Sequence, residues 1–412
     1  MAQINITLEQ DEILRLLADS SGDAFRVMLQ ESLNAVLRAE SAEQLRARPY
    51  ERTEERTDSR NGTRTRPLTT RVGTIELTVP RHRNAPFRTL VFENYRRSEA
   101  ALVATMAEMV VAGVSTAKVG RVMEEICGRS FSKQAVSEAC AELDGPVREF
   151  RERPIGGSYL FVMADATYLK VREDHRVKAK ALMIAIGLTE AGAKEVIGFG
   201  LADAETRETW TAFLSSLRAR GLSGMRMFTS DAHEGLVAAL QDVFPDVAWQ
   251  RCQAHFARNV ADGAPKHLRA GLRSELVEMF NSPTLESARE RRDEIIADYA
   301  AAAPRAVERL DAGFDDAMTV MSVPAGDMRR CTRTSNYLER LNREVKRRSR
   351  VIGVFPSAAS AMRLMGSLLI EENDRWSASR KIYYGTACEE LERRAPALVS
   401  IARAQRLLRE AA

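Results

Sequence analysis

Hydrophobic residues recur along this chain with two different periods, and the change between them divides the sequence into segments. Over residues 1–45 and 98–143 they return every three or four residues, which predicts amphipathic helices. From Tyr159 the pattern changes to three apolar runs separated by polar turns, which predict three consecutive strands. Helix, strand, helix and strand follow at residues 207–221, 225–231, 233–244 and 246–252. This order predicts an α/β core built on a sheet with mixed pairing.

Most of the remaining chain is predicted to be helical. Residues 46–66 are polar and show no period, which indicates an irregular basic arm, and the alternation over 71–81 predicts a short strand. From about Gly263 to Asp327 the sequence is helical and rich in Ala, Arg and Glu. A further helix is predicted over 335–350, followed by an apolar helix and a charged tail.

Seven segments follow from these patterns. They are N-terminal helices (1–45), a basic arm with a short strand (46–97), a helix-turn-helix region (98–147), the first part of the α/β core (148–262), an all-helical insertion (263–328), the second part of the core (329–378) and a C-terminal helical tail (379–412).

The composition is that of an ordinary globular protein and excludes several classes. The 412 residues carry a net charge of +4, and 45% of them are hydrophobic. No apolar run approaches the roughly 18 residues that a membrane span needs, and no signal peptide is recognisable. The five cysteines include no Cys-x-x-Cys pair, so neither a disulfide framework nor an all-cysteine zinc site is predicted. We therefore expect a cytoplasmic protein with reduced thiols.

Basic residues form two clusters, which point to an extended polyanion as partner. Arginines crowd the stretch 46–97, which has no lysine, and a second cluster covers 340–350. Each cluster alone is equally compatible with a solvated surface. The two helices predicted over 115–143 have the capping and spacing of a helix-turn-helix, although an ordinary helical hairpin is the alternative. The predicted DNA contacts are Arg60, Arg64, Arg66, Lys133, Gln134, Ser137, Arg343, Lys346 and Arg347.

Two aspartates of the core are candidates for metal ligands. Asp165 lies within an apolar strand, where a buried carboxylate needs a cation, a metal or a proton. Its alternative is a structural carboxylate bonded to backbone or to a basic side chain such as Lys170. Asp231 ends a strand and precedes a helix, so it is either a helix N-cap or part of a site at the strand ends.

A third candidate carboxylate lies on the helix predicted over 335–350. Glu339 has polar and basic neighbours at three- and four-residue steps, which also suits a solvated surface glutamate. Glu344 competes with it, but Arg340 and Arg348 lie four residues to either side and offer Glu344 ion pairs. The spacing of these residues leaves the choice between the two glutamates open.

Four blocks of the sequence, in order, resemble the motifs of the mutator-type insertion-sequence transposases. They are VMADATYLKVR, TSDAHEGL, RCQAHFARN and TSNYLERLNREVKRR, and the N-terminal half is similar to the same family. The resemblance covers nearly the whole chain and implies a ribonuclease-H-like core interrupted by an all-helical insertion.

The resemblance also implies roles for individual residues. It assigns the metal-binding and catalytic carboxylates to Asp165, Asp231 and Glu339, the last within a pattern that begins at Asn336 and ends at Asn342. Three hard-oxygen carboxylates suit Mg²⁺ or Mn²⁺, and we expect two ions, which stabilise the attacking and leaving oxygens of a phosphodiester. Ala166 stands where the family often has glycine, a change that leaves the carboxylate in place.

The pair Cys252 and His255 matches another family block. Two soft ligands at this spacing could form half of a zinc site, with His233 as the one further candidate. We expect a supporting structural role instead, because structural zinc sites close with four ligands. Trp210, Trp249 and Trp376 are predicted to be core residues.

The expected function is that of a DDE transposase, which cleaves transposon ends and transfers strands into target DNA. The expected partners are double-stranded DNA, as terminal inverted repeats and target, and a second or further copy of the chain, with no membrane. The alternatives are a nuclease or resolvase of the same fold, a catalytically inactive DNA-binding regulator, and a ribonuclease acting on RNA–DNA hybrids. The DNA-reading N-terminal half disfavours the last of these.

Overall fold

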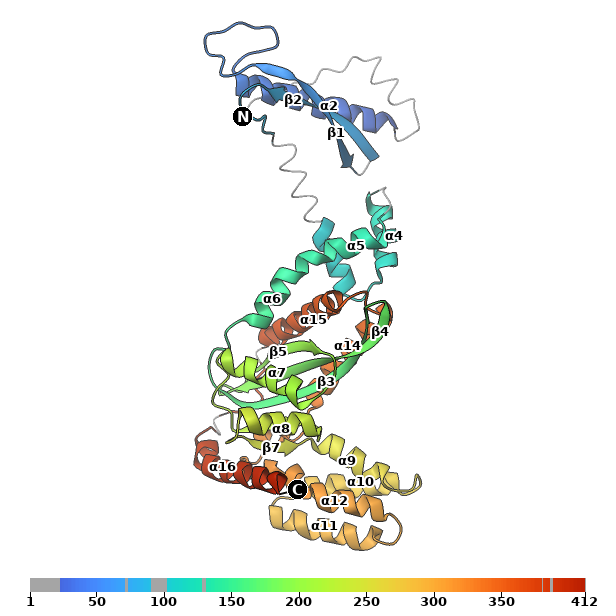
Figure 1. The fold of residues 1–412 in the computed structure, drawn as a ribbon, viewed down its shortest axis with the longest axis vertical. Helices are drawn as coiled ribbons and strands as arrows, with labels where there is room; N and C mark the ends of the chain where they lie inside the picture. Colours follow the sequence, from blue (N-terminus) through green and yellow to red (C-terminus); the bar gives the residue numbers. More distant parts are fainter. Residues whose placement is uncertain are drawn as a thin grey trace. The chain divides into compact units, whose positions relative to one another are not determined.

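The computed structural model describes residues 23–70, 73–89, 102–127, 131–379, 381–385 and 388–411 (Figure 1). The chain divides into two compact units, Met1–Glu142 and Leu143–Ala412, which are described separately. Among the described residues, no helix is long and apolar enough to cross a membrane.

In the first unit, helix α2 (Asp23–Leu45) packs on a two-stranded antiparallel sheet of β1 (Arg60–Thr70) and β2 (Gly73–His82). Leu37 of the helix joins Ile75 and Leu77 of β2 in the core between them. The expected irregular arm is therefore wrong over its last part, since residues 60–66 belong to β1. The apolar pattern did not reveal this strand, because its residues Thr63, Arg64 and Thr65 are polar and exposed.

The first unit also contains the helices of the predicted helix-turn-helix region. Residues 102–111 are helical, and α4 (Thr116–Cys127) and α5 (Lys133–Ala139) pack through Val119, Met123 and Val136. Ser132 is the N-cap of α5, because its side chain accepts a hydrogen bond from the Ala135 backbone N–H. The possible caps and turn at 128–130 lie outside the described residues, as does the start of the first helix.

The second unit is built on a five-stranded mixed sheet. The strands are β3 (Tyr159–Glu173), β4 (Arg176–Thr189), β5 (Lys194–Ala202), β6 (Met227–Ser230) and β7 (Ala248–Arg251). Their order is β5-β4-β3-β6-β7, with β3, β4 and β5 antiparallel and β6 and β7 parallel to β3. The prediction of a mixed α/β sheet, with strands in this chain order, is confirmed.

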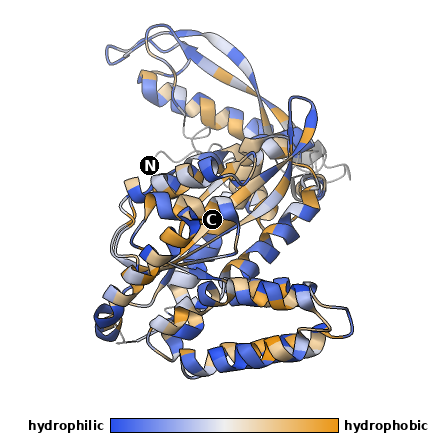
Figure 2. Cartoon of the chain, turned by 60° about the horizontal axis from the view of Figure 1, so that its bottom comes forward, coloured by the Kyte–Doolittle hydropathy of each residue, from blue (hydrophilic) through white to orange (hydrophobic). Residues whose placement is uncertain are grey.

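Helices cover both faces of this sheet (Figures 1 and 2). Helices α7 (Arg207–Ala219) and α8 (Glu234–Val243) share one core with the sheet, which contains Trp210. On the other face lie α6 (Asp144–Glu152) and α15 (Ala358–Ser379), where Gly366 leaves room for Val147. The strands are largely apolar, whereas the helices carry alternating apolar and polar bands, as burial of one helix face requires (Figure 2).

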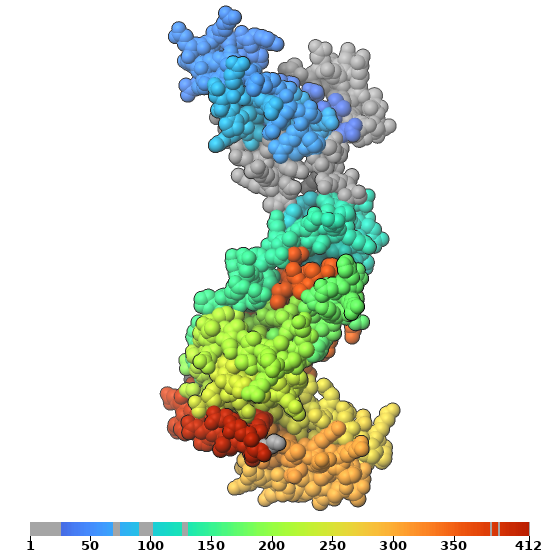
Figure 3. All heavy atoms as spheres, viewed as in Figure 1, coloured from blue at the N-terminus to red at the C-terminus, as the bar shows by residue number. Residues whose placement is uncertain are grey.

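A group of helices follows β7 and is coloured yellow and orange in Figure 3. These helices have a core of their own. Its members are α9 (Gln253–Asp262), α10 (Arg269–Phe280), α11 (Leu285–Tyr299) and α12 (Pro304–Met318), followed by the short helices η2 (Thr319–Ser322) and α13 (Asp327–Thr332). The prediction that 263–328 is helical is thus confirmed.

These helices also support the edge of the sheet. Gln250 of β7 donates to the Ala317 carbonyl at 2.7 Å and accepts from the Val320 backbone N–H. On the same edge, Gln405 of α16 (Cys388–Glu410) donates to the Trp249 carbonyl at 2.8 Å. The last part of the helical segment is therefore bonded to the sheet.

Candidate catalytic site

Two aspartates lie at the same level on neighbouring strands. In the parallel pairing of β3 with β6, Met163 is opposite Thr229. Two residues further along each chain come Asp165 and Asp231, the latter directly after β6. Because adjacent strands are about 4.8 Å apart, this register brings the two carboxylates to one place at the end of β6. The predicted positions, within the first strand and at the end of the fourth, are confirmed.

Asp165 is largely shielded from solvent and hydrogen-bonded at both oxygens. Its Oδ1 accepts from the Ala166 backbone N–H at 2.9 Å, and its Oδ2 accepts from Asn342 Nδ2 at 2.8 Å. Burial, together with the negative charge of Asp231, raises the pKa of Asp165 to about 6. The suggested partner Lys170 is exposed and takes no part in these bonds.

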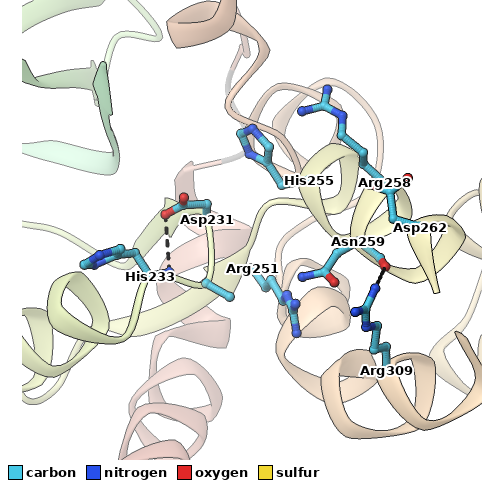
Figure 4. Close-up of a pocket in the computed structure, with 9 residues that line it drawn as sticks. Asp231, His233, Arg251, His255, Arg258, Asn259, Asp262 and Arg309 are labelled. Carbon is cyan, nitrogen blue, oxygen red and sulfur yellow. Dashed lines mark hydrogen bonds between the residues drawn. The ribbon is translucent and has the colours of Figure 1, made fainter. Parts of the chain in front are cut away.

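Asp231 is not the cap of the following helix. The N-cap of α8 is His233, whose side chain makes no capping hydrogen bond. Asp231 Oδ1 accepts instead from the His233 backbone N–H at 3.4 Å, within the loop between β6 and α8 (Figure 4). The interpretation of Asp231 as an N-cap is therefore wrong, and its carboxylate lines an open cavity.

Helix α14 (Asn336–Ile352) is attached to the sheet at both ends. Just before it begins, the backbone N–H and the hydroxyl of Ser335 donate to Cys252 Sγ at 3.3 and 3.2 Å. Beyond its end, Phe355 forms a parallel bridge with Val171 of β3. These attachments, with the Asn342–Asp165 hydrogen bond between them, fix one face of α14 against β3.

Glu339 lies on that face, one helical turn before Asn342. Its Oε1 is 3.7 Å from His255 Nε2 and 3.7 Å from an Nη of Arg258, both on α9. The same oxygen is buried and has no hydrogen-bond partner in the described part of the chain. A carboxylate oxygen that lies between two cationic groups but accepts no hydrogen bond is able to bind a further cation or a hydrogen-bond donor.

The competing glutamate is engaged elsewhere. Glu344 accepts two hydrogen bonds from Arg347, at 2.8 and 3.0 Å. This explains Glu344 as an ion-paired helix residue, as the sequence suggested, although the partner is Arg347 rather than Arg340 or Arg348. Because Glu344 lines a different cavity, its carboxylate is not part of the arrangement around Asp165 and Asp231.

Cys252 and His255 support the site from the start of α9. Cys252 is fully buried, and its sulfur ties this helix to the start of α14. Interaction with Cys252, and then the charges of Asp165 and Asp231, raise the pKa of His255 to about 9. His255 therefore carries positive charge at neutral pH beside Glu339.

The three carboxylates have the chemistry to bind a divalent cation, but their side chains do not form a complete coordination site. Asp165 and Asp231 offer carboxylate oxygens at one level of the sheet, and Glu339 offers an oxygen that accepts no hydrogen bond. As the side chains stand, no group of three or more His, Cys, Asp and Glu residues within the described ranges is close enough to hold a metal ion. Glu339 is turned towards His255 and Arg258, so it is the ligand that would have to reorient.

A cavity of about 580 Å³ opens beside Asp231 (Figure 4). Its wall is mostly basic and polar, and is formed by Asp231, Ala232, His233, Arg251, His255, Arg258, Asn259, Asp262 and Arg309. Arg258 and Asn259 lie within the block RCQAHFARN, so the sequence carried a signal for them. Arg309, whose Nη1 donates to the Asn259 carbonyl at 2.7 Å, comes from α12 and had none.

The most deeply placed of these arginines is Arg251, at the end of β7. Burial lowers its pKa, and its guanidinium stacks 4.6 Å from the ring centroid of Phe256. It forms no salt bridge within the described part of the chain, so its charge is available to an anion in the cavity.

A family model described as "Transposase, Mutator family" matches residues 1–379. The chain belongs to this family of transposases.

Relatives agree with the match over nearly the full length. The transposase for insertion sequence element IS256 in transposon Tn4001 of Staphylococcus aureus is 41% identical over 387 residues, 93% of this chain and 99% of the relative. The transposase for insertion sequence element IS1081 of Mycobacterium tuberculosis is 38% identical, covering 93% and 92%. That for element ISRM5 of Rhizobium meliloti is 37% identical, covering 88% and 91%.

The transposase presents most of its predicted DNA contacts to solvent. Arg64, Lys133 and Gln134 of the first unit are exposed, as are Arg343, Lys346 and Arg347 of α14. Asn336, at the start of α14, is exposed too. Arg66 and Ser137 are half-buried.

Arg60 has a structural role. Its guanidinium donates to the carbonyls of Ala47 and Arg48, at 2.8 and 3.1 Å, and so holds the segment after α2.

Proposed function

We propose that this transposase cleaves phosphodiester bonds at the ends of an insertion sequence and transfers the freed 3′-hydroxyl into target DNA, with divalent metal. The observation that carries the proposal is the register of β3 and β6, which sets Asp165 level with Asp231 beside the helix that bears Glu339. A ribonuclease-H-like core, as the resemblance implies, is compatible with the strand order β5-β4-β3-β6-β7.

Asp165, Asp231 and Glu339 would hold two Mg²⁺ or Mn²⁺ ions. When bound, such ions stabilise negative charge on the attacking and leaving oxygens of the phosphodiester. The neighbouring protein groups have separate tasks. The side-chain amide of Asn342 donates a hydrogen bond to Asp165 and so orients its carboxylate. The charged carboxylate can accept this bond. His255 and Arg258 attract the Glu339 carboxylate, which would turn from them towards the aspartates to bind metal.

The basic wall of the cavity would receive the DNA strand. Positive charge next to Asp231 comes from Arg251, Arg258 and Arg309. One guanidinium group can donate two parallel hydrogen bonds to the oxygens of a phosphate. DNA phosphates drawn to this wall would lie beside the carboxylates. A helix-turn-helix of α4 and α5, together with the arginines of β1, would bind the transposon end in double-stranded form. Such DNA places the reaction in the bacterial cytosol, and joining two ends calls for a dimer or larger assembly.

The test uses DNA that carries the ends of the element and a supercoiled target plasmid. We expect end cleavage and joined products with Mg²⁺ or Mn²⁺ and none with EDTA. Cleavage without joining, under conditions in which pre-cleaved ends are also not joined, would make the protein a nuclease or resolvase. Binding without any cleavage would make it a regulator.

A further inference from the structure

A second cavity, of about 440 Å³, lies on another side of α14 from Glu339. It is bounded by β5, α14, α15 and the segment 381–385, and it combines aromatic with basic side chains. Its principal residues are Lys194, Tyr337, Arg340, Arg343, Trp376 and Tyr383. Trp376, expected to be a core residue, is half-buried in this wall, whereas Trp210 and Trp249 are buried as predicted.

Lys194 is a buried cation surrounded by aromatic rings. Only 8% of the residue is exposed, and Nζ lies 3.9 Å from the ring centroid of Trp376, 4.4 Å from Tyr337 and 5.0 Å from Tyr383. No carboxylate of the described ranges forms a salt bridge with it. Ring faces stabilise an ammonium group without neutralising it, so the positive charge remains available to an anion.

The other charges around the cavity leave an excess of positive charge. Its two acids are already paired, Glu372 with Arg375 and Glu344 with Arg347. Arg340 and Arg343 are exposed and form no salt bridge in the described part of the chain. Burial, with the nearby charges of Lys381 and Arg340, lowers the pKa of Lys194 to about 8, although the charge of Glu372 acts in the opposite direction.

We propose that this cavity binds one nucleotide of a single DNA strand, its phosphate at Lys194 and Arg340 and its base or sugar against the aromatic wall. Proteins that bind single strands combine a basic groove with aromatic side chains in this way. The proposal rests on the proposed function in one respect, that DNA is the ligand.

The surrounding surface favours a nucleotide within DNA over a free nucleotide. From Arg340 and Arg343 the exposed face of α14 continues with Lys346, Arg347 and Arg350. Such a stripe extends beyond one phosphate and suits a strand whose successive phosphates follow the helix. Since Arg340 belongs to α14, a strand held here would be bound by the same helix that carries Glu339.

The experiment measures binding of full-length protein to a fluorescent oligothymidylate at several salt concentrations. The variants are Lys194→Met and Arg340→Gln, the second at an exposed side chain whose loss leaves the fold intact. The control is Lys178→Met, an exposed lysine of β4 that is paired with Glu173 and Asp174. A substitution that removes one phosphate-binding cation should reduce the slope of log affinity against log salt by about 0.7 on a single strand. We expect this reduction in both test variants and not in the control.

Tryptophan fluorescence supplies a local readout. The oligothymidylate should change the emission of the wild type, and the change should be absent in Trp376→Phe. Equal slopes and affinities for wild type, Lys194→Met and Arg340→Gln would overturn the proposal while leaving DNA binding in place. Thymidine 5′-monophosphate and inorganic phosphate are tested in the same way. If either changes Trp376 emission with an affinity equal to that of the oligonucleotide, the assignment to DNA is overturned.

Failure of the proposed function would give a different experimental result from failure of the cavity proposal. A protein that binds the oligonucleotide through Lys194, Arg340 and Trp376 but never cleaves transposon ends would retain this cavity and lose the transposase mechanism. A wild type that binds no DNA would overturn both.

Discussion

Asn342 donates its side-chain amide to Asp165 at 2.8 Å and so joins residues 177 positions apart in the chain. The bond connects α14 with β3 at the level of Asp231, and it leaves Asn342 Oδ1 without a partner among the described residues. One helix thus carries both a group that orients the first aspartate and, a turn earlier, Glu339. The geometry of the site therefore depends on the position of α14.

Removing any one of the three carboxylate charges should abolish cleavage. We expect Asp165→Asn, Asp231→Asn and Glu339→Gln each to lower the cleavage rate by roughly a thousandfold or more, because metal-assisted charge stabilisation contributes several kcal/mol. Affinity for transposon-end DNA should change little, since each substitution keeps the shape of the side chain. Gel-based cleavage and binding assays on the same DNA measure the two effects.

Glu344→Gln is the matched control, because Glu344 lies on the same helix but is paired with Arg347. We expect it to cleave DNA at a near wild-type rate. An inactive Glu344→Gln beside an active Glu339→Gln would reverse the assignment.

Asp165→Asn should also stabilise the metal-free protein, in a pH-dependent way. Burial and Asp231 raise the pKa of Asp165 from 3.8 to about 6. Below the lower value the carboxyl is protonated in both folded and unfolded chains. As pH rises towards 6 and beyond, the unfolded chain is ionised while the folded one resists ionisation, so stability is lost. The asparagine cannot ionise, and a rotated Asn342 amide can still bond to it.

We therefore expect the Tm of Asp165→Asn, measured with EDTA, to exceed that of the wild type near neutral pH by more than it does at about pH 4. A pH-independent difference between the two proteins would show that Asp165 titrates normally in the folded state.

Much of this site could be predicted from sequence because its strands have simple patterns. The apolar runs around Asp165 and before Asp231 are buried strands, so their number and order follow from local periodicity. The assignment of Glu339 rather than Glu344 came from the family resemblance, because the spacing of the residues had left that choice open.

The parts that escaped prediction depend on contacts distant in sequence. Strand β1 lacks an apolar alternation, and it forms through its antiparallel pairing with β2, with Leu68 as its residue in the core shared with β2 and α2. Arg309 reaches the cavity beside Asp231 only through the packing of α12 on α9. The aromatic surroundings of Lys194 join residues from β5, α14, α15 and 381–385, which no local pattern connects.

Cys252 should act as a structural brace rather than a zinc ligand. Cys252→Ala would leave the backbone N–H and the hydroxyl of Ser335 without their acceptor, at a cost of about 1–3 kcal/mol in the free energy of unfolding. Cys252→Ser keeps an acceptor and should cost less. Urea unfolding measures both variants. Elemental analysis of purified wild type should find less than one zinc per chain, and a full equivalent that disappears in both variants would refute the brace.

The first unit should bind DNA with strong salt dependence, provided that α2 is retained. Leu37 covers Ile75 and Leu77, so a fragment that begins at residue 46 would expose the apolar face of its strands. We expect a fragment of residues 1–147 to lose affinity steeply with salt, by about 0.9 in log affinity per log salt for each phosphate contact on duplex DNA. Arg64→Gln, at an exposed side chain, should reduce that slope, whereas unchanged binding across the salt range would make the arginines a solvated surface.

The last prediction concerns the helical segment 263–328. If this segment were only an insertion that interrupts the core, a linker in its place would leave a folded core. The structure gives a different expectation, because Gln250 of β7 bonds to Ala317 and Val320 within this segment. Each buried polar group left without a partner costs about 1–3 kcal/mol, and the apolar residues Phe256 and Val260 of α9 would also be exposed.

We therefore expect the linker variant to unfold at a much lower urea concentration than the wild type, or to aggregate. A role in binding the transposon end or a partner subunit must be tested without disturbing that support. Arg273→Gln combined with Arg305→Gln changes exposed positions of α10 and α12 and should leave urea unfolding unaltered. If the segment contacts DNA or a second subunit, this double variant will show weaker end binding or a smaller assembly by light scattering. A linker variant that folds and cleaves ends at full rate would show the segment to be dispensable.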